Sequence, residues 1–262
     1  MCQPLMQAFS EVADSIRRAP QISLFLDFDG TLSWLAASPD EAHLDQPARE
    51  ALTRISRIER IVTTVISGRA IEDLYSRIRL DGLIYAGNHG LEIFGRQFRF
   101  VEPRAATFRE AAAQLARHLA EELQSIPGAF VEYKAYTASV HYRQISDADL
   151  PKVESAVRST VAPARAQFRV NSGKKVFEVV PRTGWHKGMA VQLINSTLSS
   201  RGELLSVYLG DDTTDEDAFG VLPDAITVKV GDPAATRAKY QLPDPDAVRE
   251  FLVWLAGVSP VP

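Results

Sequence analysis

Short apolar runs alternate with helix-patterned segments at both ends of the chain. Continuous apolar or β-branched runs predict buried strands, whereas apolar residues spaced three and four apart predict helices. The predicted strands are 22–28, 61–67, 83–87, 204–210 and 225–231, with a hairpin at 91–100. The predicted helices are 46–58, 70–78, 187–198 and 244–257. This alternation is typical of an α/β fold in which helices cover both faces of a parallel sheet.

The middle of the chain has a different pattern. A long Ala-rich helix is predicted over 106–124, and each predicted helix here is followed by two strands rather than one. The further elements are two strands within 130–144, a helix at 149–161, and strands at 167–171 and 175–180. This order is typical of an α+β module with antiparallel strands. We therefore expect a core domain of residues 1–104 and 182–262, interrupted by an inserted domain of residues 105–181.

Composition and charge narrow the class of protein. The 262 residues carry a net charge of −4, and 45% of them are hydrophobic. A nucleic-acid or anionic-membrane binder usually has a basic excess, so neither class is favoured. No apolar run approaches the roughly 20 residues that span a bilayer, and no signal peptide is evident. The single cysteine, Cys2, rules out an intrachain disulfide and fits a reducing compartment. We expect a cytoplasmic protein.

Polar residues follow several of the predicted strands. Ligands of open parallel sheets bind at the carboxyl ends of the strands. Residues in four separate segments would meet there: Asp27 and Asp29 after the first strand, Ser67 after the second, Lys187 at a helix start, and Asp211, Asp212 and Asp215 after 204–210.

These residue types fit one kind of chemistry. Converging carboxylates repel one another unless a cation binds them, and a set of oxygen ligands without histidine or cysteine points to Mg²⁺. A lysine and a serine beside such a metal suit a phosphoryl group. Asp27 can then act as a nucleophile. Asp29, two residues on and on the same side of an extended chain, can act as acid and base.

The neighbouring residues have local roles to play. Gly30 allows a tight turn after the aspartates, and Thr31 can cap the segment after it.

Each motif also has a purely structural interpretation. An isolated DxD occurs in calcium loops and helix caps, Ser67–Gly68 is a common turn, and Lys187 could be a solvated charge. Thr213 and Glu216 have the spacing of a capping box, so we expect the acidic run both to start a helix and to serve the site.

Taken together, these motifs resemble a known superfamily. DFDGT, ISGR, the lysine of HKG and GDDTTDE resemble the four-motif signature of the haloacid dehalogenase phosphohydrolases. The stretches SPDEA, GNHGLEI, SVHYR and GKKVFEVVP narrow the resemblance to the trehalose-6-phosphate phosphatases. The resemblance extends from about Leu24 to Phe219.

The resemblance implies a fold, an activity and a cofactor. It implies a Rossmann-like parallel-sheet hydrolase core with an inserted α+β cap domain that sets substrate specificity. The implied activity is Mg²⁺-dependent hydrolysis of trehalose 6-phosphate to trehalose and phosphate through an aspartyl-phosphate. The implied roles are Asp27 as nucleophile, Asp29 as acid and base, Ser67 and Lys187 as phosphoryl ligands, Asp27, Asp211 and the Asp29 carbonyl as metal ligands, and Asp212 and Asp215 as supports behind them.

The sugar would be bound by other residues. In the family, a Lys-x-x-x-Glu pair contacts glucose hydroxyls. Lys174 and Glu178 have this spacing, and Lys175 is the alternative to Lys174 as the contacting lysine. The further candidates are Arg69, Asn88 and His89 in the core, and Lys134, His141 and Arg143 in the cap. His141 and Arg143 alternate with apolar residues and could instead face solvent. No role is assigned to Trp185 or His186.

Two alternative functions remain open. One keeps the chemistry and changes the substrate to another sugar phosphate, such as sucrose phosphate. The other is a catalytically silent regulator that binds a sugar phosphate or a synthase. A silent protein would be expected to lack Asp27 or Asp29, and both are present. A disaccharide phosphate is therefore the expected substrate, and a trehalose-6-phosphate synthase the expected functional partner.

Overall fold

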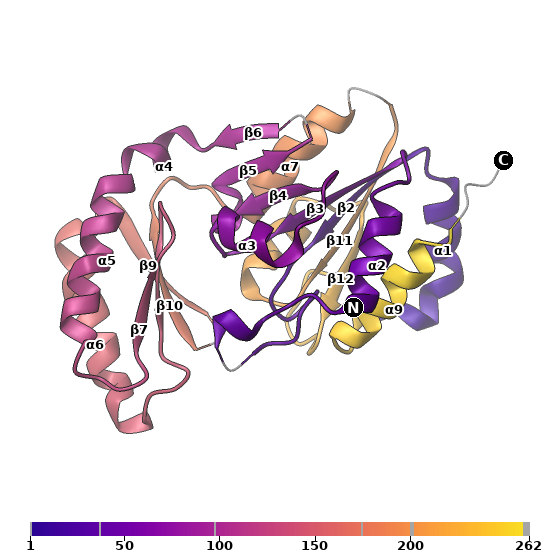
Figure 1. The fold of residues 1–262 in the computed structure, drawn as a ribbon. Coiled ribbons are helices and arrows are strands. Elements are labelled where there is room, and N and C mark those ends of the chain that lie inside the picture. Colours follow the sequence, from indigo (N-terminus) through magenta and orange to yellow (C-terminus); the bar gives the residue numbers. More distant parts are fainter. Residues whose placement is uncertain (1, 37, 97, 174, 200–201, 259–262) are drawn as a thin grey trace. The chain divides into compact units, whose positions relative to one another are not determined.

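The computed structural model describes residues 2–36, 38–96, 98–173, 175–199 and 202–258. These residues form two compact units (Figure 1). Within the described residues, the first unit comprises 2–36, 42–100 and 186–258, and the second comprises 38–41 and 101–185.

The first unit is built on a sheet with the strand order β1-β13-β12-β11-β2-β3-β4-β5-β6. All pairs from β1 to β4 are parallel, and β5 is antiparallel to β4. The strands are β1 (Gln3–Pro4), β2 (Gln21–Leu26), β3 (Ile61–Ile66), β4 (Ile84–Gly87), β5 (Glu92–Gly95), β6 (Phe98–Val101), β11 (Leu204–Gly210), β12 (Ile226–Val230) and β13 (Tyr240–Leu242). The predicted α/β class with a parallel sheet is confirmed.

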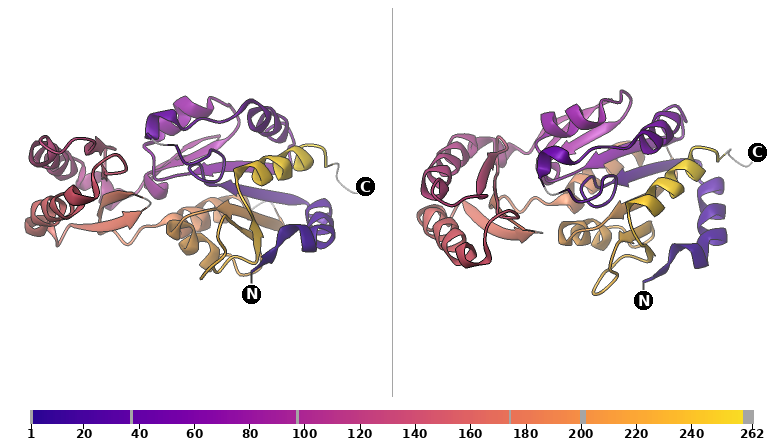
Figure 2. Two further views of the ribbon diagram at one scale, coloured as in Figure 1. Left: turned by 90° about the horizontal axis from the view of Figure 1, so that it is seen from below. Right: turned by 60° about the horizontal axis from the view of Figure 1, so that its bottom comes forward.

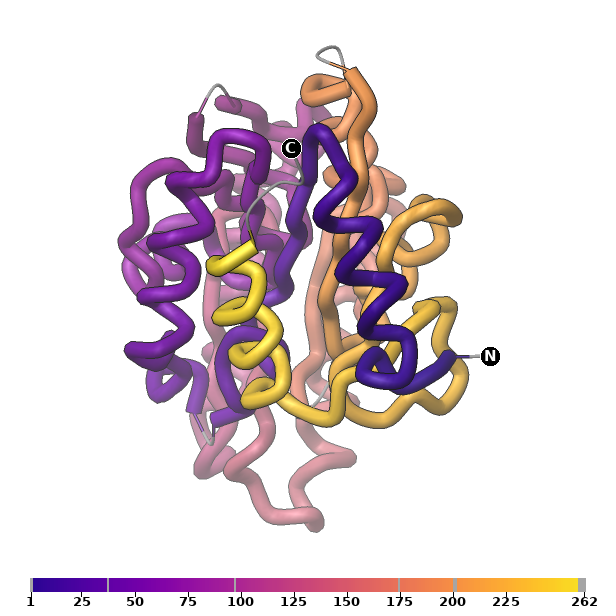
Figure 3. The backbone as a smooth tube through the Cα atoms, turned by 90° about the vertical axis from the view of Figure 1, so that its right-hand side faces the viewer, coloured from indigo at the N-terminus to yellow at the C-terminus, as the bar shows by residue number. Residues whose placement is uncertain are grey.

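Helices cover both faces of this sheet (Figure 2). The helices of one face are α1 (Phe9–Arg18), α2 (Gln46–Ile55), α3 (Ile71–Ile78) and α9 (Pro245–Leu255), and those of the other are α7 (Lys187–Leu198) and α8 (Glu216–Gly220). Helix α9 contacts both α1, through Phe9 and Trp254, and α2 (Figure 3). Because both faces are covered, β2 is apolar throughout: Leu24 packs toward α9 and its neighbours, and Phe25 stacks on Tyr208 on the opposite face.

Side-chain caps explain where two of these helices begin. Asp45 accepts a hydrogen bond from the amide of Ala48 at the start of α2, and Asp244 accepts one from Ala247 at the start of α9. In both helices a proline occupies the first turn, where no amide hydrogen is required. The helices therefore start at positions that their sequences specify locally.

The second unit is an antiparallel sheet with helices on one face (Figure 1). Its strands, in the order β7-β8-β10-β9, are β7 (Phe130–Tyr133), β8 (Ala138–His141), β10 (Val176–Pro181) and β9 (Phe168–Gly173). Its helices are α4 (Pro103–Thr107), α5 (Arg109–Leu123) and α6 (Leu150–Val161). Alternate residues of the strands, including Val140 and Phe177, join the apolar face of α5 in one buried cluster.

The structure corrects the sequence interpretation in two respects. The helix predicted over 106–124 is two helices, separated at Phe108, which has non-helical φ/ψ and packs against Phe168. Helix α1 and the short strands β1 and β13 were not predicted. The strands are too short to show an alternating pattern, and polar residues dominate α1. Among the described residues, no helix has the length and apolar character needed to cross a membrane.

Candidate active site

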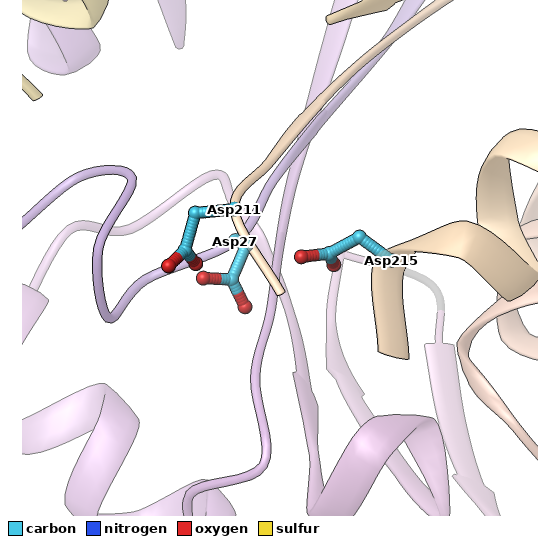
Figure 4. A group of neighbouring side chains, drawn as sticks. All are labelled: Asp27, Asp211 and Asp215. Atoms are coloured by element: carbon cyan, nitrogen blue, oxygen red, sulfur yellow. The ribbon is translucent and has the colours of Figure 1, made fainter. Parts of the chain in front are cut away.

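Strand β2 lies where the order of the strands reverses. The chain adds β3 and β4 on one side of it, and β11, β12 and β13 lie on the other side. Ligands of open α/β sheets bind at the carboxyl ends of the strands at such a point. Asp27 follows β2 and Asp211 follows β11, and the amide of Asp27 donates to the carbonyl of Leu209 at 3.0 Å. The two aspartates therefore lie at the ends of adjacent strands (Figure 4).

Lys187 joins two of the predicted carboxylates. Its buried Nζ donates to Oδ1 of Asp27 and to Oδ1 of Asp215, each at 2.7 Å. The hydroxyl of Tyr208 donates to the same oxygen of Asp215 at 2.7 Å, and the amide of Asp212 donates to the other at 2.9 Å. Both oxygens of Asp215 thus accept hydrogen bonds from the protein, and this carboxylate holds Lys187 in place.

Burial and charge shift the protonation of this cluster. Burial raises the pKa of the Asp27 carboxyl well above its usual value; Lys187 lowers it, and the carboxylates of Asp215 and Asp211 raise it again. Burial lowers the pKa of Lys187, but the charges of Asp215 and Asp27 outweigh it and raise this pKa well above its ordinary value. Lys187 is therefore a fixed cation inside the protein.

The donor set fits a divalent cation. Asp27, Asp211 and Asp215 are buried, and each offers an oxygen within 4.8 Å of the others (Figure 4). With all three carboxylates ionised, the ammonium of Lys187 would leave two negative charges uncompensated; a bound cation would compensate them in place of the proton that the raised pKa of Asp27 favours. Because both oxygens of Asp215 already accept hydrogen bonds, Asp27 and Asp211 are the better placed ligands.

Gly30 allows the loop after β2 to approach Asp211. Its φ of +92° is in the region that favours glycine. A Cβ atom at this position would lie 2.2 Å from Oδ2 of Asp211, which is a severe clash. The predicted turn is present, and the close approach is an additional reason for the glycine. The predicted cap by Thr31 is wrong: its hydroxyl is buried and has no hydrogen-bond partner among the described residues.

Asp29 lies at the end of a chain of alternating charges. Arg69 donates from Nε to Oδ2 of Asp29 at 2.7 Å and from Nη2 to Oδ1 at 2.6 Å. Arg69 also donates from Nη1 to Asp73 at 2.8 Å, and Asp73 in turn accepts from Arg77. Arg69, a candidate for the sugar from the sequence, is thus placed on the predicted acid and base. Asp73 was not singled out from the sequence, because a charge in a first helical turn is commonplace.

The loop after β4 holds the loop after β3. The amide of Asn88 donates to the carbonyl of Arg69 at 2.7 Å, and the amide of His89 donates to that of Ser67 at 2.8 Å. Asn88 and His89 both have positive φ angles, and the Asn88 side chain is buried and donates to Glu92. Ser67 is also buried, and its Oγ accepts from the amide of Arg69 at 3.2 Å. The two predicted motifs are therefore joined by backbone hydrogen bonds.

The acidic segment after β11 starts a helical turn, as expected, but with a different cap. The capping box is formed by Asp212 and Asp215 rather than by Thr213 and Glu216. Glu216 instead accepts hydrogen bonds from Thr236 and from the amide of Arg237. The Asp215 carboxylate, which holds Lys187, therefore also fixes the start of this helix. Residue spacing alone could not show which pair forms the capping box.

Lys229 is a residue of this region that the sequence analysis missed. Its Nζ donates to the backbone carbonyl of Asp211 at 2.7 Å and lies 4.0 Å from Glu216. Lys229 is buried on β12, the neighbour of β11. The only signal for it was a charged residue within an apolar strand, in ITVKV.

Glu178, a candidate sugar ligand of the second unit, lies on the sheet face opposite the helices. In the register of the strands, Glu132, Ser139, Glu178 and Asn171 form one row across the sheet. Ser139 and Glu178 each lie between two apolar residues that pack against the helices, and Glu132 and Asn171 each have one such neighbour. By the alternation of a strand, this row therefore belongs to the other face.

Two candidates of this unit, His141 and Lys134, contact the same carboxylate. His141 Nε2 lies 2.9 Å from Oε2 of Glu132, Lys134 Nζ lies 3.6 Å from the same oxygen, and Phe130 stacks on His141. His141 and Lys134 thus meet at one carboxylate, which the sequence analysis had not considered. Arg143 lies two residues beyond β8, and Lys174 falls outside the described residues.

Trp185 and His186, which had no assigned role, make local contacts in the structure. The amide of Trp185 donates to the hydroxyl of Thr183 at 3.2 Å. His186 is the N-cap residue of α7, and its Nδ1 lies 4.0 Å from Asp217. Gly188 follows Lys187 because a Cβ atom there would lie 2.4 Å from the carbonyl of Asp217.

Comparisons with known proteins agree on one family. A family model described as trehalose-phosphatase matches residues 25–246. The "Trehalose 6-phosphate phosphatase RA3" of Zea mays is 36% identical over 259 residues, which cover 92% of this chain and 71% of that protein. The "Probable trehalose-phosphate phosphatase 3" of Oryza sativa subsp. japonica is 33% identical, with 98% and 75% covered. The structure of the C. albicans trehalose-6-phosphate phosphatase C-terminal domain has the same fold, with a TM-score of 0.83, 20% identity and 99% of each chain covered.

Proposed function

This chain belongs to the trehalose-phosphatase family and is a phosphatase, and on that premise we propose that it hydrolyses trehalose 6-phosphate to trehalose and phosphate. The observation that carries the proposal is the buried pairing of Lys187 with Asp27 and Asp215, beside Asp211, at the ends of β2 and β11. This arrangement supplies a fixed nucleophile and a fixed cation at one point, as phosphoryl transfer requires.

The proposed reaction has two steps. In the first, an oxygen of Asp27 forms a bond to phosphorus while the ester bond to the sugar oxygen breaks, and Asp29 gives a proton to that oxygen. In the second, a water attacks the aspartyl-phosphate and passes a proton to Asp29, and phosphate leaves with Asp27 restored. Lys187 and Ser67 hold the phosphoryl oxygens in both steps. Asp212 and Asp215 support the site through the capping box and the hydrogen bond to Lys187.

We propose Mg²⁺ as the cation. Asp27, Asp211 and the backbone carbonyl of Asp29 would hold it, because an all-oxygen donor set without histidine or cysteine suits this ion. When bound, it neutralises negative charge on the phosphoryl group and on the carboxylates. The proposal is supported by the convergence of three buried carboxylates beside one lysine.

We propose that the inserted domain, residues 105–181, provides the specificity for the sugar. Glu178 is the leading candidate there because it belongs to the polar row of the sheet, and Lys134, His141, Arg143 and Lys174 are further candidates. In the core, Asn88 and His89 remain candidates for sugar contacts, whereas Arg69 is engaged with Asp29. A cytoplasmic location and a functional pairing with a trehalose-6-phosphate synthase remain predictions.

The direct test is phosphate release from trehalose 6-phosphate, compared with sucrose 6-phosphate and glucose 6-phosphate, with and without Mg²⁺. We expect preference for the trehalose ester and its loss on chelation of the metal. Activity on another sugar phosphate alone would keep the chemistry and reject the proposed substrate. Silence on all three from the folded protein would favour the regulator.

The nucleophile is tested by replacing Asp27. Asp27→Asn should lower kcat by about 10⁴-fold or more, because residues that act as a unit in covalent catalysis lose most of the rate when one is removed. The same change at the exposed Asp14 of α1, which pairs with Arg17, is the matched control and should leave kcat unchanged. Mass spectrometry of acid-quenched wild-type enzyme should locate the phosphoryl group on the peptide containing Asp27. Near-normal turnover of Asp27→Asn would reject the covalent mechanism.

A further inference from the structure

The side chain of Asp29 is held by a two-pronged contact. The Nε and Nη2 atoms of Arg69 each donate to a different oxygen of Asp29, at 2.7 and 2.6 Å. This parallel geometry fixes both the position and the plane of a carboxylate, which a lysine cannot do. The Asp29 side chain keeps about a third of its surface exposed, at 32%, so packing alone does not fix it.

Arg69 is itself fixed from three sides. Its carbonyl accepts from the amide of Asn88 at 2.7 Å, so the loop after β4 anchors its backbone. Its Nη1 donates to Asp73 at 2.8 Å, and its guanidinium lies 5.4 Å from the ring centroid of Phe28. Only 8% of the Arg69 side chain is exposed. A long side chain that would otherwise sample many rotamers is thus ordered before any substrate binds.

We propose that Arg69 is a positioning residue for Asp29, and that Asp73 holds Arg69 in place for this task. The inference rests on the proposed function, in which Asp29 transfers the protons. An acid or base must lie within hydrogen-bond reach of its target, and a displacement of about 1 Å can cost about 100-fold in rate. Without the contact to Arg69, Asp29 could still transfer protons, but its side chain would no longer be held in position.

The charges support this role. Burial lowers the pKa of Arg69, but the hydrogen bonds and charges of Asp29 and Asp73 outweigh burial and raise it, so the guanidinium stays charged. Burial raises the pKa of Asp73, and its contacts with Arg77 and Arg69 outweigh this and lower it. Asp73 therefore remains an anion beside Arg69 at neutral pH.

The leaving group provides a specific readout. In the first step the electron pair of the breaking ester bond goes to the leaving oxygen. A sugar alkoxide needs a proton from Asp29 at that moment, whereas p-nitrophenolate is a stable anion and needs none. In the second step the attacking water must lose a proton to Asp29 whatever the first leaving group was. Misplacement of Asp29 should therefore slow both steps for a sugar phosphate, but only the second for p-nitrophenyl phosphate.

The experiment compares these two substrates for the wild type, Arg69→Lys, Arg69→Ala and Asp73→Asn, with Mg²⁺ present. With trehalose 6-phosphate we expect kcat to fall about 100-fold for both Arg69 variants and about tenfold for Asp73→Asn, with KM nearly unchanged. With p-nitrophenyl phosphate, stopped-flow measurements on the variants should show a rapid burst of one nitrophenolate per enzyme, followed by slow turnover. Asp73 is partly exposed, and the contacts described here connect it to Asp29 through Arg69. The Asp73 variant therefore tests the proposal even if an Arg69 variant folds poorly.

Arg60→Ala is the matched control. Arg60 is another arginine with a structural role, and it donates to the carbonyls of Ile16 and Ala19 at the end of α1. Its loss should lower the melting temperature without any change in the dependence on the leaving group. Melting curves of all variants separate destabilisation from misplacement.

Three results would overturn the proposal. A burst slowed as much as sugar-phosphate turnover would place Arg69 on the phosphoryl group. A raised KM for trehalose 6-phosphate with normal kcat would make Arg69 a sugar ligand. Unchanged kinetics in every variant would leave it a structural residue. Asp29→Asn, run in parallel, tests the proposed function separately: if that variant hydrolyses the sugar phosphate normally, the assignment of Asp29 fails whatever Arg69 does.

Discussion

The two units hold their charged clusters in different ways. In the first unit, Lys187, Asp27 and Asp215 are almost fully buried and come from segments far apart in the chain. In the second unit, Glu132 meets His141 and Lys134 on one hairpin, and a quarter of the Glu132 side chain is exposed. A buried charge depends on its partners, whereas a partly exposed one is also stabilised by water. The first cluster should therefore tolerate much less change than the second.

The largest expected effect is that of removing the buried cation. Lys187→Met would leave Asp27 and Asp215 without their ammonium, and breaking a buried pair costs about 3–5 kcal/mol of unfolding free energy. Lys134→Met in the second unit is the matched change and should cost less, because His141 remains beside Glu132. Urea denaturation of both variants measures the difference. Equal losses would remove the distinction between the two clusters.

The next largest effect concerns the close approach of the loop after β2. Gly30→Ala would place a methyl group against Asp211, and we expect kcat to fall by about 100-fold as this proposed metal ligand is displaced. Gly231→Ala is the control, since Gly231 has a similar φ of +85° but nothing within 4 Å of the position that a Cβ atom would take. Both variants share the cost of a positive φ, about 1–2 kcal/mol. Similar kcat values in the two would show that the contact with Asp211 does not matter.

A smaller effect is expected in the second unit. Glu178→Ala should raise KM for trehalose 6-phosphate about tenfold, because a lost hydrogen bond to a neutral partner is worth about 1–1.5 kcal/mol. Turnover of p-nitrophenyl phosphate, which has no sugar, should not change. Glu154→Ala on α6, where the glutamate pairs with Arg158, is the control from the same unit. An equal loss on both substrates would argue against a role for Glu178 in sugar recognition.

The smallest effect is a difference in alkaline stability. Burial raises the pKa of Tyr85 in the first unit to about 12, and burial also raises that of Tyr142 in the second. A raised pKa means that the folded state keeps its proton longer than the unfolded chain, whose tyrosines titrate near 10. The contribution to stability is therefore complete below about pH 10 and is lost as the pH rises toward about 12.

Tyr85→Phe should reduce this alkaline loss of stability, and Tyr142→Phe should reduce it by less. The hydroxyl of Tyr85 donates to the carbonyl of Leu80 and accepts from its amide, so the variant also loses two hydrogen bonds at every pH. Denaturation at a series of pH values from about 8 to about 11 separates the constant loss from the pH-dependent one. A profile for Tyr85→Phe that is parallel to that of the wild type would contradict the prediction.

The sequence interpretation was accurate for features that depend on neighbouring residues and less accurate for features that depend on residues far apart in the chain. Strands such as β3 and the start of α2 depend on residues a few positions apart, and the pattern placed them within a residue or two. The break at Phe108 was missed because the cause is a long-range contact with Phe168. The capping box was misplaced because its second carboxylate is that of Asp215, which Lys187 and Tyr208 hold in position, and not that of Glu216.

The sequence by itself determined the fold class and the residue types of the chemistry. A buried apolar strand that ends in DFDGT, with acidic and basic motifs after other strands, is informative because burial of charge needs a compensating partner. Only the tertiary structure decided which groups are partners: Arg69 with Asp29, Lys229 with the Asp211 carbonyl, and His141 with Glu132. Side-chain hydrogen bonds act over about 3 Å, and spacing along a chain does not define distances of that size between separate strands.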